Sequence, residues 1–587
     1  MCGIHGVIHF NGAKPTQLKR EIGTMLNRTK HRGPNQSDVI IFGNQVALGM
    51  NRLSIVAPDE HSTIQTSASG NYAVFNGEIV NHDQLRRGLK NPPHQHSDSS
   101  IILPLLEEHG QGYIRELAGM FAIGVYNLSE ERVQLWRDPL GVKPLYYNHS
   151  KDGVIFSSEI KAIAAVMPHE PEIDFAALDH GLRYRFHPGR SSIFPEIQRV
   201  LPGETVIFDR DKMSREQYWT LKPNKTSLES GIGIEQFREL LVQIIKEHTQ
   251  ADVPGGFFVS GGLDSSLVTA IALQESDSSP YKQPISLRFL PNSVVDEGYG
   301  KLLEKFLGKP FEWVDVTDAT ARQALMDMIP FMDEPLENPI HIGTYLMAKR
   351  AHELGLKSVL TGDGSDEFFL GYQRHEPWFN GTKDPGTAYK KWLWTMSPEE
   401  ANELYTPDAA NLVKPMIDAE GHPIEPFLNV EQALRFERLD RLSEYHNMRL
   451  DRMTMAHGIE ARVPLQDHRI VEFALKIPLP TLFGNSGKAW LQEVAKPWVP
   501  PVIINRKKIH FPSLPDQWLS GEGADWAAEI LLDQGARTRK WIKPDVLEKY
   551  INEHKDNIRS HGRLLWALTV LELWLKNQTS WRNPKRS

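Results

Sequence analysis

Eight residues at positions 259–266, Val-Ser-Gly-Gly-Leu-Asp-Ser-Ser, combine residue types and spacing that suit phosphate binding. Glycine lets backbone N–H groups approach an anion closely, and the serine hydroxyls can donate to phosphate oxygens. The carboxylate of Asp264 would repel a bare phosphate, so it is better suited to a bridging magnesium ion. The stretch therefore predicts a site for a magnesium nucleotide, with an ordinary glycine-serine turn as the alternative.

The residues on either side predict that this stretch joins a strand to a helix. Residues 255–258 are apolar and β-prone, and residues 267–273 can pack as a buried helix. The spacing matches neither the dinucleotide fingerprint nor the Walker loop. It resembles the SGGxDS pyrophosphate loop of ATP pyrophosphatases, which cleave ATP between its α and β phosphates to adenylate a substrate. The resemblance implies ATP contacts from Val259, Ser260, Gly261, Gly262, Asp264 and Ser265.

Positions 358–366 repeat this arrangement, with a short apolar strand, a turn that contains two glycines, and the start of a helix. Ligands of open α/β sheets bind at the carboxyl ends of strands, so the two turns are predicted to face one nucleotide. Asp366 is then the predicted partner of Asp264 on magnesium. An acidic residue at a helix start is also favoured by the helix dipole, which is the structural alternative for Asp366.

Together the two turns resemble the synthetase domain of the glutamine-dependent asparagine synthetases. Residues 457–467, the pair Gly487-Lys488 and residues 506–512 extend the resemblance over most of the chain. It implies ATP contacts from Leu287, on a predicted strand, and from Thr361 and Gly362. It also implies catalytic roles for Asp363 and Lys508. Many family members have glutamate where this chain has Asp363, whose side chain is one methylene shorter.

The chain contains a single cysteine, Cys2, which excludes an internal disulfide and a cysteine-rich metal site. Removal of Met1 would give Cys2 both a thiol and a free α-amino group. Because an α-amine has a pKa of about 7.7, part of it is uncharged at neutral pH and can accept the thiol proton. Cys2 is therefore a candidate nucleophile that carries its own base.

Motifs at 31–34 (His-Arg-Gly-Pro), 52–56, 75–78 (Phe-Asn-Gly-Glu) and 97–98 follow Cys2. In this order they resemble the glutaminase domain of class II glutamine amidotransferases, which are N-terminal-nucleophile hydrolases. The resemblance implies that the glutamine-binding residues are Arg52, Leu53, Ser54, Ile55, Val56, Asn76, Gly77, Glu78 and Asp98.

These residue types suit the chemistry of glutamine hydrolysis. Arg52 can bind the α-carboxylate of glutamine, and Asp98, with Glu78 nearby, can bind its α-ammonium group. Attack by Cys2 creates an oxyanion, for which the family assigns two donors, the Asn76 side chain and the Gly77 N–H. Asn-Gly is also a strong hairpin-turn signal, and both interpretations can hold at once.

Bulk properties limit the classes of partner. The 587 residues predict two to four domains, and 66 basic against 74 acidic residues give a net charge of −8 without a basic patch for nucleic acid. No apolar run is long enough to span a membrane, and no signal segment precedes the first motif, so a cytoplasmic protein is predicted. A homodimer is possible.

We expect an α/β protein with an N-terminal α/β/β/α N-terminal-nucleophile hydrolase sandwich. A C-terminal parallel-sheet domain like those of ATP pyrophosphatases should follow, with a helical C-terminal part. Residues 2–205 are predicted to form the glutaminase domain, the polar residues 206–230 a linker, and residues 231–587 the ATP-dependent synthetase domain.

The functional hypothesis is an asparagine synthetase that uses glutamine, ATP and Mg²⁺. Ammonia released at Cys2 would attack an aspartyl-adenylate, which implies an internal passage for ammonia. The main alternative is an amidotransferase for another carboxylate, such as a cell-wall or natural-product precursor. The β-lactam-forming relatives need no ammonia, so an intact set of Cys2, Arg52, Asn76 and Asp98 counts against them. A non-catalytic scaffold would need broken motifs.

Overall fold

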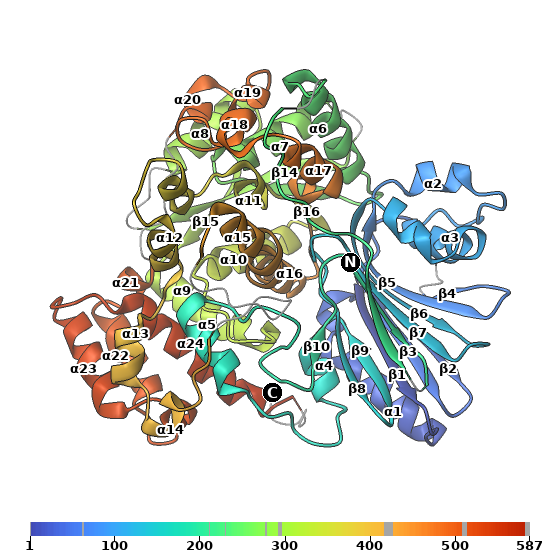
Figure 1. Ribbon diagram of the computed structural model, residues 1–587, viewed down its shortest axis with the longest axis horizontal. Coiled ribbons are helices and arrows are strands. Elements are labelled where there is room, and N and C mark those ends of the chain that lie inside the picture. Colours follow the sequence, from blue (N-terminus) through green and yellow to red (C-terminus); the bar gives the residue numbers. More distant parts are fainter. Residues whose placement is uncertain are drawn as a thin grey trace.

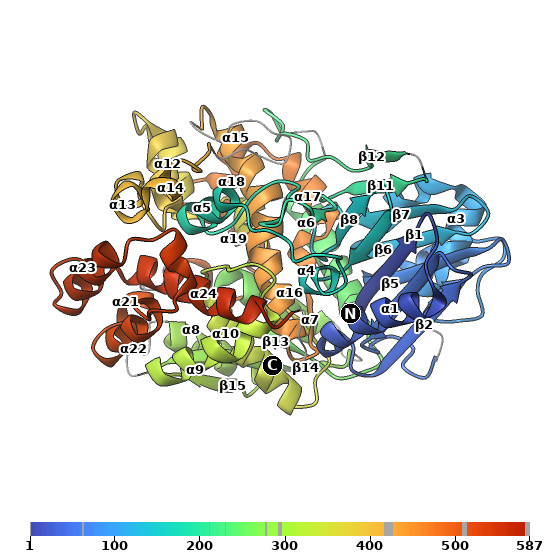
Figure 2. The same cartoon turned by 90° about the horizontal axis from the view of Figure 1, so that it is seen from below.

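The computed structural model describes residues 2–60, 64–210, 212–228, 231–275, 279–290, 296–415, 427–506 and 514–581. It confirms the predicted α/β class. Two antiparallel sheets belong to the N-terminal part, a parallel sheet follows, and helices make up the C-terminal part (Figure 1). Figure 2 shows the antiparallel sheets at one end of the molecule and the last helices, from α21 (Leu514–Trp518) to α24 (Gly562–Gln578), at the other.

The first antiparallel sheet has six strands in the order β10-β8-β9-β1-β3-β2. Their bounds are β1 Cys2–His9, β2 Gln36–Phe42, β3 Val46–Arg52, β8 Tyr146–Ser150, β9 Gly153–Ser157 and β10 Gln198–Arg199. The second has the order β12-β11-β7-β6-β5-β4. Its strands are β4 Gln65–Thr66, β5 Asn71–Ile79, β6 Gly119–Asn127, β7 Arg132–Arg137, β11 Glu204–Phe208 and β12 Met213–Gln217.

The two sheets pack face to face, with helices on their outer faces. Along β1, Ile4 and Ile8 point into the core between the sheets, whereas Val7 points the other way, to α1 (Pro15–Arg28). On the second sheet, Phe75 of β5 packs in an apolar cluster with α3 (Ile102–His109). The order helix, sheet, sheet, helix follows. It explains why almost every residue of β1 is buried although the strand is antiparallel.

The parallel sheet has five strands in the order β15-β14-β13-β16-β17. They are β13 Gly255–Phe258, β14 Tyr281–Phe289, β15 Glu312–Val316, β16 Ser358–Leu360 and β17 Glu460–Arg462. Strand β13 pairs with both β14 and β16, and all of these pairs are parallel. The loops that leave β13 and β16 therefore begin at the same edge of the sheet, side by side.

Helices fill most of the remaining chain. In the N-terminal part α2 (His82–Gly88), α4 (Ile160–Ala164) and α5 (Phe175–Tyr184) accompany α1 and α3. The later helices are α6 Ile234–His248, α7 Leu263–Glu275, α8 Asp296–Leu307, α9 Asp318–Met328, α10 Ile340–Glu353, α11 Ser365–Phe369, α12 Pro385–Leu393, α13 Pro398–Leu404, α14 Pro407–Ala410, α15 Val430–Arg435, α16 Met448–Met455, α17 His468–Leu475, α18 Leu479–Phe483, α19 Ala489–Ala495, α20 Pro501–Ile504, α21 Leu514–Trp518, α22 Glu522–Leu531, α23 Pro544–Lys555 and α24 Gly562–Gln578. Between α15 and α16 the chain forms a π-helix, Phe436–Asn447.

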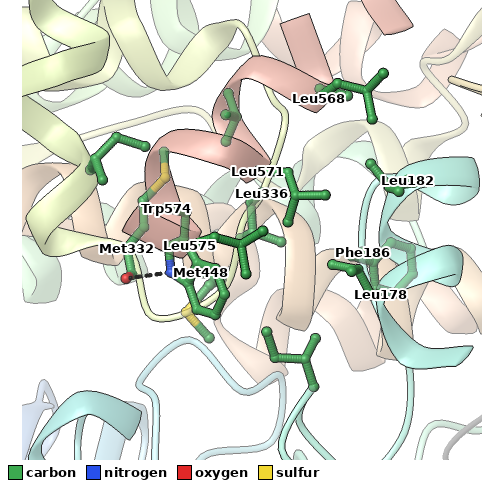
Figure 3. Packing of buried hydrophobic residues seen from close by; sticks show 14 of the residues in the cluster. Leu178, Leu182, Phe186, Met332, Leu336, Met448, Leu568, Leu571, Trp574 and Leu575 are labelled. Atoms are coloured by element: carbon green, nitrogen blue, oxygen red, sulfur yellow. Dashed lines mark hydrogen bonds between the residues drawn. The ribbon is translucent and has the colours of Figure 1, made fainter. Parts of the chain in front are cut away.

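Helix α24 ties the C-terminal part to the rest of the molecule. It is apolar on all sides and buried along most of its length, as a helix surrounded by protein should be. Figure 3 shows its Leu571 and Trp574 in one apolar cluster with Leu182 of α5 and with Met448 at the start of α16. The Trp574 indole N–H donates to the carbonyl oxygen of Met332, 3.2 Å away. The end of α5 is thereby fixed beside the synthetase part. Among the described residues, no helix is both long and apolar enough to cross a bilayer.

Candidate functional site

The first predicted loop lies between β13 and α7, as its sequence predicts. Gly261 has a φ of +69°, and a Cβ there would lie 2.7 Å from the backbone nitrogen of Gly300, so only glycine fits. The Ser260 and Ser265 hydroxyl oxygens are 3.1 Å apart, and the Gly262 N–H donates to Ser260 Oγ at 3.3 Å. The turn thus gathers two hydroxyls and backbone N–H groups at the start of α7.

The second loop, between β16 and α11, touches the first. A Cβ on Gly362 would lie 2.5 Å from the backbone nitrogen of Ser265 and 2.7 Å from the carbonyl carbon of Asp264. The two backbones therefore approach each other as closely as a glycine allows. The structure brings together residues 259–265 and 361–366, as the strand-end argument predicts.

The side chains of Asp264 and Asp366 converge on one ammonium group. Lys488 Nζ lies 2.5 Å from a carboxylate oxygen of each. Burial alone would lower the pKa of Lys488, but the two carboxylates outweigh burial and raise it. Lys488 enters from the start of α19, and nothing in the spacing of the sequence links it to the two loops. The sequence singled out Gly487-Lys488 only as part of the family resemblance and did not predict the contact of Lys488 with both aspartates.

Asp264 and Asp366 supply part of the ligand set that a magnesium ion needs. Two adjacent carboxylates are the ligands that Mg²⁺ uses together with phosphates and water, and Asp264 Oδ1 has no hydrogen-bond partner among the described residues. Within the same residues no cluster of three or more His, Cys, Asp or Glu side chains could hold a metal without further ligands. Binding between the two aspartates would also require Lys488 to move from its present position.

Both loops line a cavity of about 1020 Å³. Leu287 of β14 lies in its wall, and the Leu287 side chain occupies space that a side chain at Gly343 would fill. Asp363 also lines the cavity and forms an ion pair with Arg449 of α16. Lys508 falls outside the described residues.

The predicted nucleophile starts the first strand. Cys2 is buried, and its backbone nitrogen donates to Asn76 Oδ1 at 2.9 Å. The amide nitrogen of the same Asn76 side chain is buried and has no hydrogen-bond partner among the described residues. Burial raises the pKa of the Cys2 thiol, and a hydrogen bond from the Leu53 backbone and the charge of Arg52 partly oppose that rise. Asn76 thus offers an uncommitted donor beside the thiol.

The turn interpretation of Asn76-Gly77 is wrong. Both residues lie inside β5, where they pair with Ala122 and Phe121 of β6. Gly77 has a φ of +149°, and a Cβ there would lie 2.0 Å from the carbonyl oxygen of Met120. Glycine is therefore required by close packing within the sheet rather than by a hairpin.

Several of the residues predicted to bind glutamine lie near Cys2: Arg52 is its partner in the pairing of β1 with β3, and the charge of Asp98 acts on its thiol. The Arg52 guanidinium donates to carbonyl oxygens of the following loop, including Ala57 at 2.8 Å and Val56 at 3.2 Å. It has no carboxylate partner within the described part of the chain. Asp98 accepts the Ile79 N–H at 3.0 Å, and burial raises the pKa of its carboxyl. Between Arg52 and Val56, Leu53 and Ile55 are buried, and the Ser54 N–H is bonded to Asn35.

Glu78 is differently placed from the other predicted residues. Arg462 of β17 donates to it at 2.7 Å, so a residue of the synthetase part already neutralises this carboxylate. Burial raises its pKa well above the usual value even so. Only Oε1 of Glu78 has no hydrogen-bond partner among the described residues.

A buried ionic bridge, which the sequence did not predict, joins the two candidate sites. Arg32 donates from Nε to the carbonyl oxygen of Cys2 at 3.1 Å, and from its two terminal nitrogens to Asp451 at 2.7 and 2.9 Å. Asp451 lies on α16, and two residues earlier the same helix carries Arg449, the partner of Asp363. A single helix therefore contacts both sites.

Comparison with known proteins agrees with this two-part arrangement. A family model described as asparagine synthase matches residues 236–576, and one described as a glutamine amidotransferase domain matches residues 1–219. Asparagine synthetase (glutamine-hydrolyzing) 1 of Bacillus subtilis is 27% identical over 623 residues, which cover 98% of this chain and 96% of the relative. Asparagine synthetase B (glutamine-hydrolyzing) of Escherichia coli is 26% identical, over 93% and 88%. Amidase chry2 of Gibberella zeae is 25% identical, over 86% and 88%.

Proposed function

The chain belongs to the asparagine synthase family, and from that premise we propose that it makes asparagine from aspartate, ATP and glutamine-derived ammonia. The observation that carries the proposal is the contact between the two strand-end loops, which places two aspartates and several donors around one cavity. Such a site suits a nucleotide polyphosphate. The homologous glutaminase half supplies the source of nitrogen.

In the first half-reaction Cys2 Sγ attacks the amide carbon of glutamine. After removal of Met1, the nitrogen now held by Asn76 Oδ1 is the α-amine that accepts the thiol proton. The uncommitted amide nitrogen of Asn76, with the Gly77 N–H, donates to the oxyanion. Ammonia leaves, and water hydrolyses the resulting thioester to glutamate. Arg52 and Asp98 hold the α-carboxylate and the α-ammonium group of the substrate.

In the second half-reaction an oxygen of the acceptor carboxylate attacks the α-phosphorus of ATP and pyrophosphate leaves. Ammonia then attacks the acyl-adenylate and AMP leaves. Ser260, Ser265 and Thr361 would donate to phosphate oxygens, and Leu287 would face the adenine. A magnesium ion held by Asp264 and Asp366 would supply charge neutralisation at the phosphates.

Two further residues would act in this half-reaction. One belongs to the second loop and the other to the basic segment that follows α20. Asp363, fixed by Arg449, would position the attacking groups at the carboxylate. Lys508 would stabilise negative charge that develops on the phosphates. The displacement of Lys488 toward a phosphate oxygen would free both aspartates for the metal ion.

The test is pyrophosphate release measured with a panel of carboxylates in the presence of ATP, Mg²⁺ and either glutamine or ammonium. Aspartate-dependent pyrophosphate and asparagine in equal amounts are expected. Release with a different carboxylate and none with aspartate would refute the asparagine assignment and keep the adenylation assignment. No release with any carboxylate would refute both.

A further inference from the structure

The cavity continues past the nucleotide loops into a region lined by arginines. Three of them come from distant parts of the chain: Arg185 follows α5, Arg441 lies in the π-helix, and Arg563 begins α24. The packing of α24 against α5 (Figure 3) brings these segments together. We refer to Arg185, Arg441 and Arg563 as the arginine cluster.

Arg441 is buried with only a long ion pair to balance its charge. Its side chain is 3% exposed, and neither Nε nor Nη1 has a hydrogen-bond partner among the described residues. The nearest carboxylate there is that of Glu437, 3.6 Å from Nε. Glu437 is already engaged by two nitrogens of Arg374 and by the hydroxyl of Tyr389. A buried guanidinium in this state is unfavourable unless an anion reaches it.

Arg185 is held in a strained conformation beside Arg441. Its φ of +79° is unusual for a residue other than glycine, and such strain persists where the surrounding structure imposes it, often at ligand sites. Tyr445 joins the two arginines: its ring lies 4.3 Å from the Arg441 guanidinium, and its hydroxyl interacts with Arg185. Glu337 lies 3.3 Å from Arg185 Nε, without hydrogen-bond geometry.

Arg563 adds a third cation to the same wall. Repulsion from Arg185 is the largest influence on Arg563 and lowers its pKa. Repulsion from Arg374 and Arg185 acts on Arg441 in the same direction, after burial. Arg185 therefore lies close enough to repel both Arg563 and Arg441. Glu337 is the one carboxylate within 4.0 Å of Arg185 among the described residues. The π-helix that presents Arg441 and Tyr445 is itself a rare conformation that recurs at functional sites.

We propose that the arginine cluster binds the second carboxylate of the acceptor and is the part of the cavity that selects a dicarboxylate over a monocarboxylic acid. This inference rests on the proposed adenylation of a carboxylate in the same cavity. The carboxylate that reacts lies toward Asp363 and the nucleotide loops, and the second carboxylate lies between Arg441 and Arg185. Glu337 Oε2, buried and without a hydrogen-bond partner in the described part of the chain, is suited to an ammonium group on the same acceptor.

The experiment compares acids that differ only in the second carboxylate. The pairs are aspartate with β-alanine, and succinate with butyrate, each measured by ATP–pyrophosphate exchange and by thermal shift. Exchange needs no ammonia, and the thermal shift needs no turnover. Wild-type protein should favour the dicarboxylate of a pair by at least about tenfold in kcat/KM, because a hydrogen bond to a charged group contributes about 1.5–3 kcal/mol.

Arg441→Met removes the charge and keeps an apolar stem in its place. It should lower kcat/KM for the dicarboxylate by about 10–100-fold and abolish the thermal shift by succinate. The value for the monocarboxylate should stay unchanged. Because the buried arginine has only a long ion pair when no acceptor is bound, the variant alone should melt at or above the wild-type temperature. If Arg441→Met does not fold, Arg563→Gln replaces it in the test. Arg563 is at an exposed position, and its replacement should give the same change in selectivity.

The matched control is Arg350→Met. Arg350 lies on α10, pairs with Glu312 and Glu353, and is outside the cavity lining, so no selectivity change is expected. Equal use of both acids in a pair, or an equal loss for both in Arg441→Met and Arg563→Gln, would overturn the inference. A third outcome separates the two proposals. If exchange fails with every carboxylate, the proposed adenylation is refuted. If succinate then still raises the melting temperature of the wild type but not that of Arg441→Met, the anion site is supported.

Discussion

Replacement of Asp451 by asparagine tests the ionic bridge between the two candidate sites. The carboxylate accepts two hydrogen bonds from Arg32 and one at 3.0 Å from Arg452, and it is 3% exposed. Asparagine has nearly the same volume but no charge. The change therefore leaves Arg32 with Glu159, at 3.0 Å, as its carboxylate partner, whereas Arg452 keeps Asp333 at 2.6 Å.

Loss of one partner from a buried ion pair costs about 3–5 kcal/mol, because the remaining charge stays desolvated. Asp451→Asn should lower the free energy of unfolding by that amount. Asp209→Asn is the control: Asp209 lies 2.6 Å from Arg132, but both side chains are about one-third exposed. An exposed pair is worth about 0–1 kcal/mol, so the control should change the free energy of unfolding little.

Urea unfolding followed by tryptophan fluorescence compares the two variants. Because the Arg32 side chain also fixes the carbonyl of Cys2, Asp451→Asn should in addition slow glutamine hydrolysis, whereas Asp209→Asn should not. Burial would raise the pKa of Asp451, but Arg32 and Arg452 lower it below the usual 3.8. The stabilisation is thus present above that pH, and the difference from wild type should shrink as the pH falls through the lowered value. Equal midpoints for the two variants would refute a stabilising role of the bridge.

Three further outcomes are expected. Cys2→Ala should lose glutamine hydrolysis and glutamine-dependent synthesis yet make product from ammonium salt, increasingly so at mildly alkaline pH; retained hydrolysis would exclude the N-terminal nucleophile. Asp264→Asn or Asp366→Asn should abolish pyrophosphate release with either nitrogen source and leave glutamine hydrolysis intact, and normal release would exclude their role at the metal. Burial and Asp366 raise the pKa of Glu367 to about 7 from 4.5, so the folded protein binds more protons than the unfolded chain between these values and loses stability as the pH rises. Urea midpoints at pH 5 and pH 8 should show that Glu367→Gln removes this loss of stability at higher pH. An unchanged pH dependence in the variant would exclude Glu367 as its cause.

Local patterns predicted the elements that carry the nucleotide loops. The strand at 255–258 and the strand at 358–360 have the bounds expected from their apolar runs and following glycines. The parallel pairing then brings the two loops together without further information. The α/β class and the order of the two halves follow from the same motifs.

Contacts between distant residues were beyond the reach of those patterns. Asn76-Gly77 has the composition of a turn, but pairing with β6 makes it part of a strand. Lys488 lies 2.5 Å from Asp264, which is 224 residues away, and spacing carries no signal for such a contact. The arginine cluster likewise depends on the packing of α24 against α5, which is a property of the folded chain.

The two ion pairs that join the halves of the chain have opposite polarities. Arg32 of the first half pairs with Asp451 of the second, whereas Glu78 of the first pairs with Arg462 of the second. Each charge is buried, so a sliding or rotation of one half would leave several desolvated groups unpaired at once. The two ion pairs therefore favour the present relative placement of the halves. A fixed placement of the two halves would suit the proposed transfer of ammonia from Cys2 to an acyl-adenylate in the cavity, because it would keep the distance between the two sites constant.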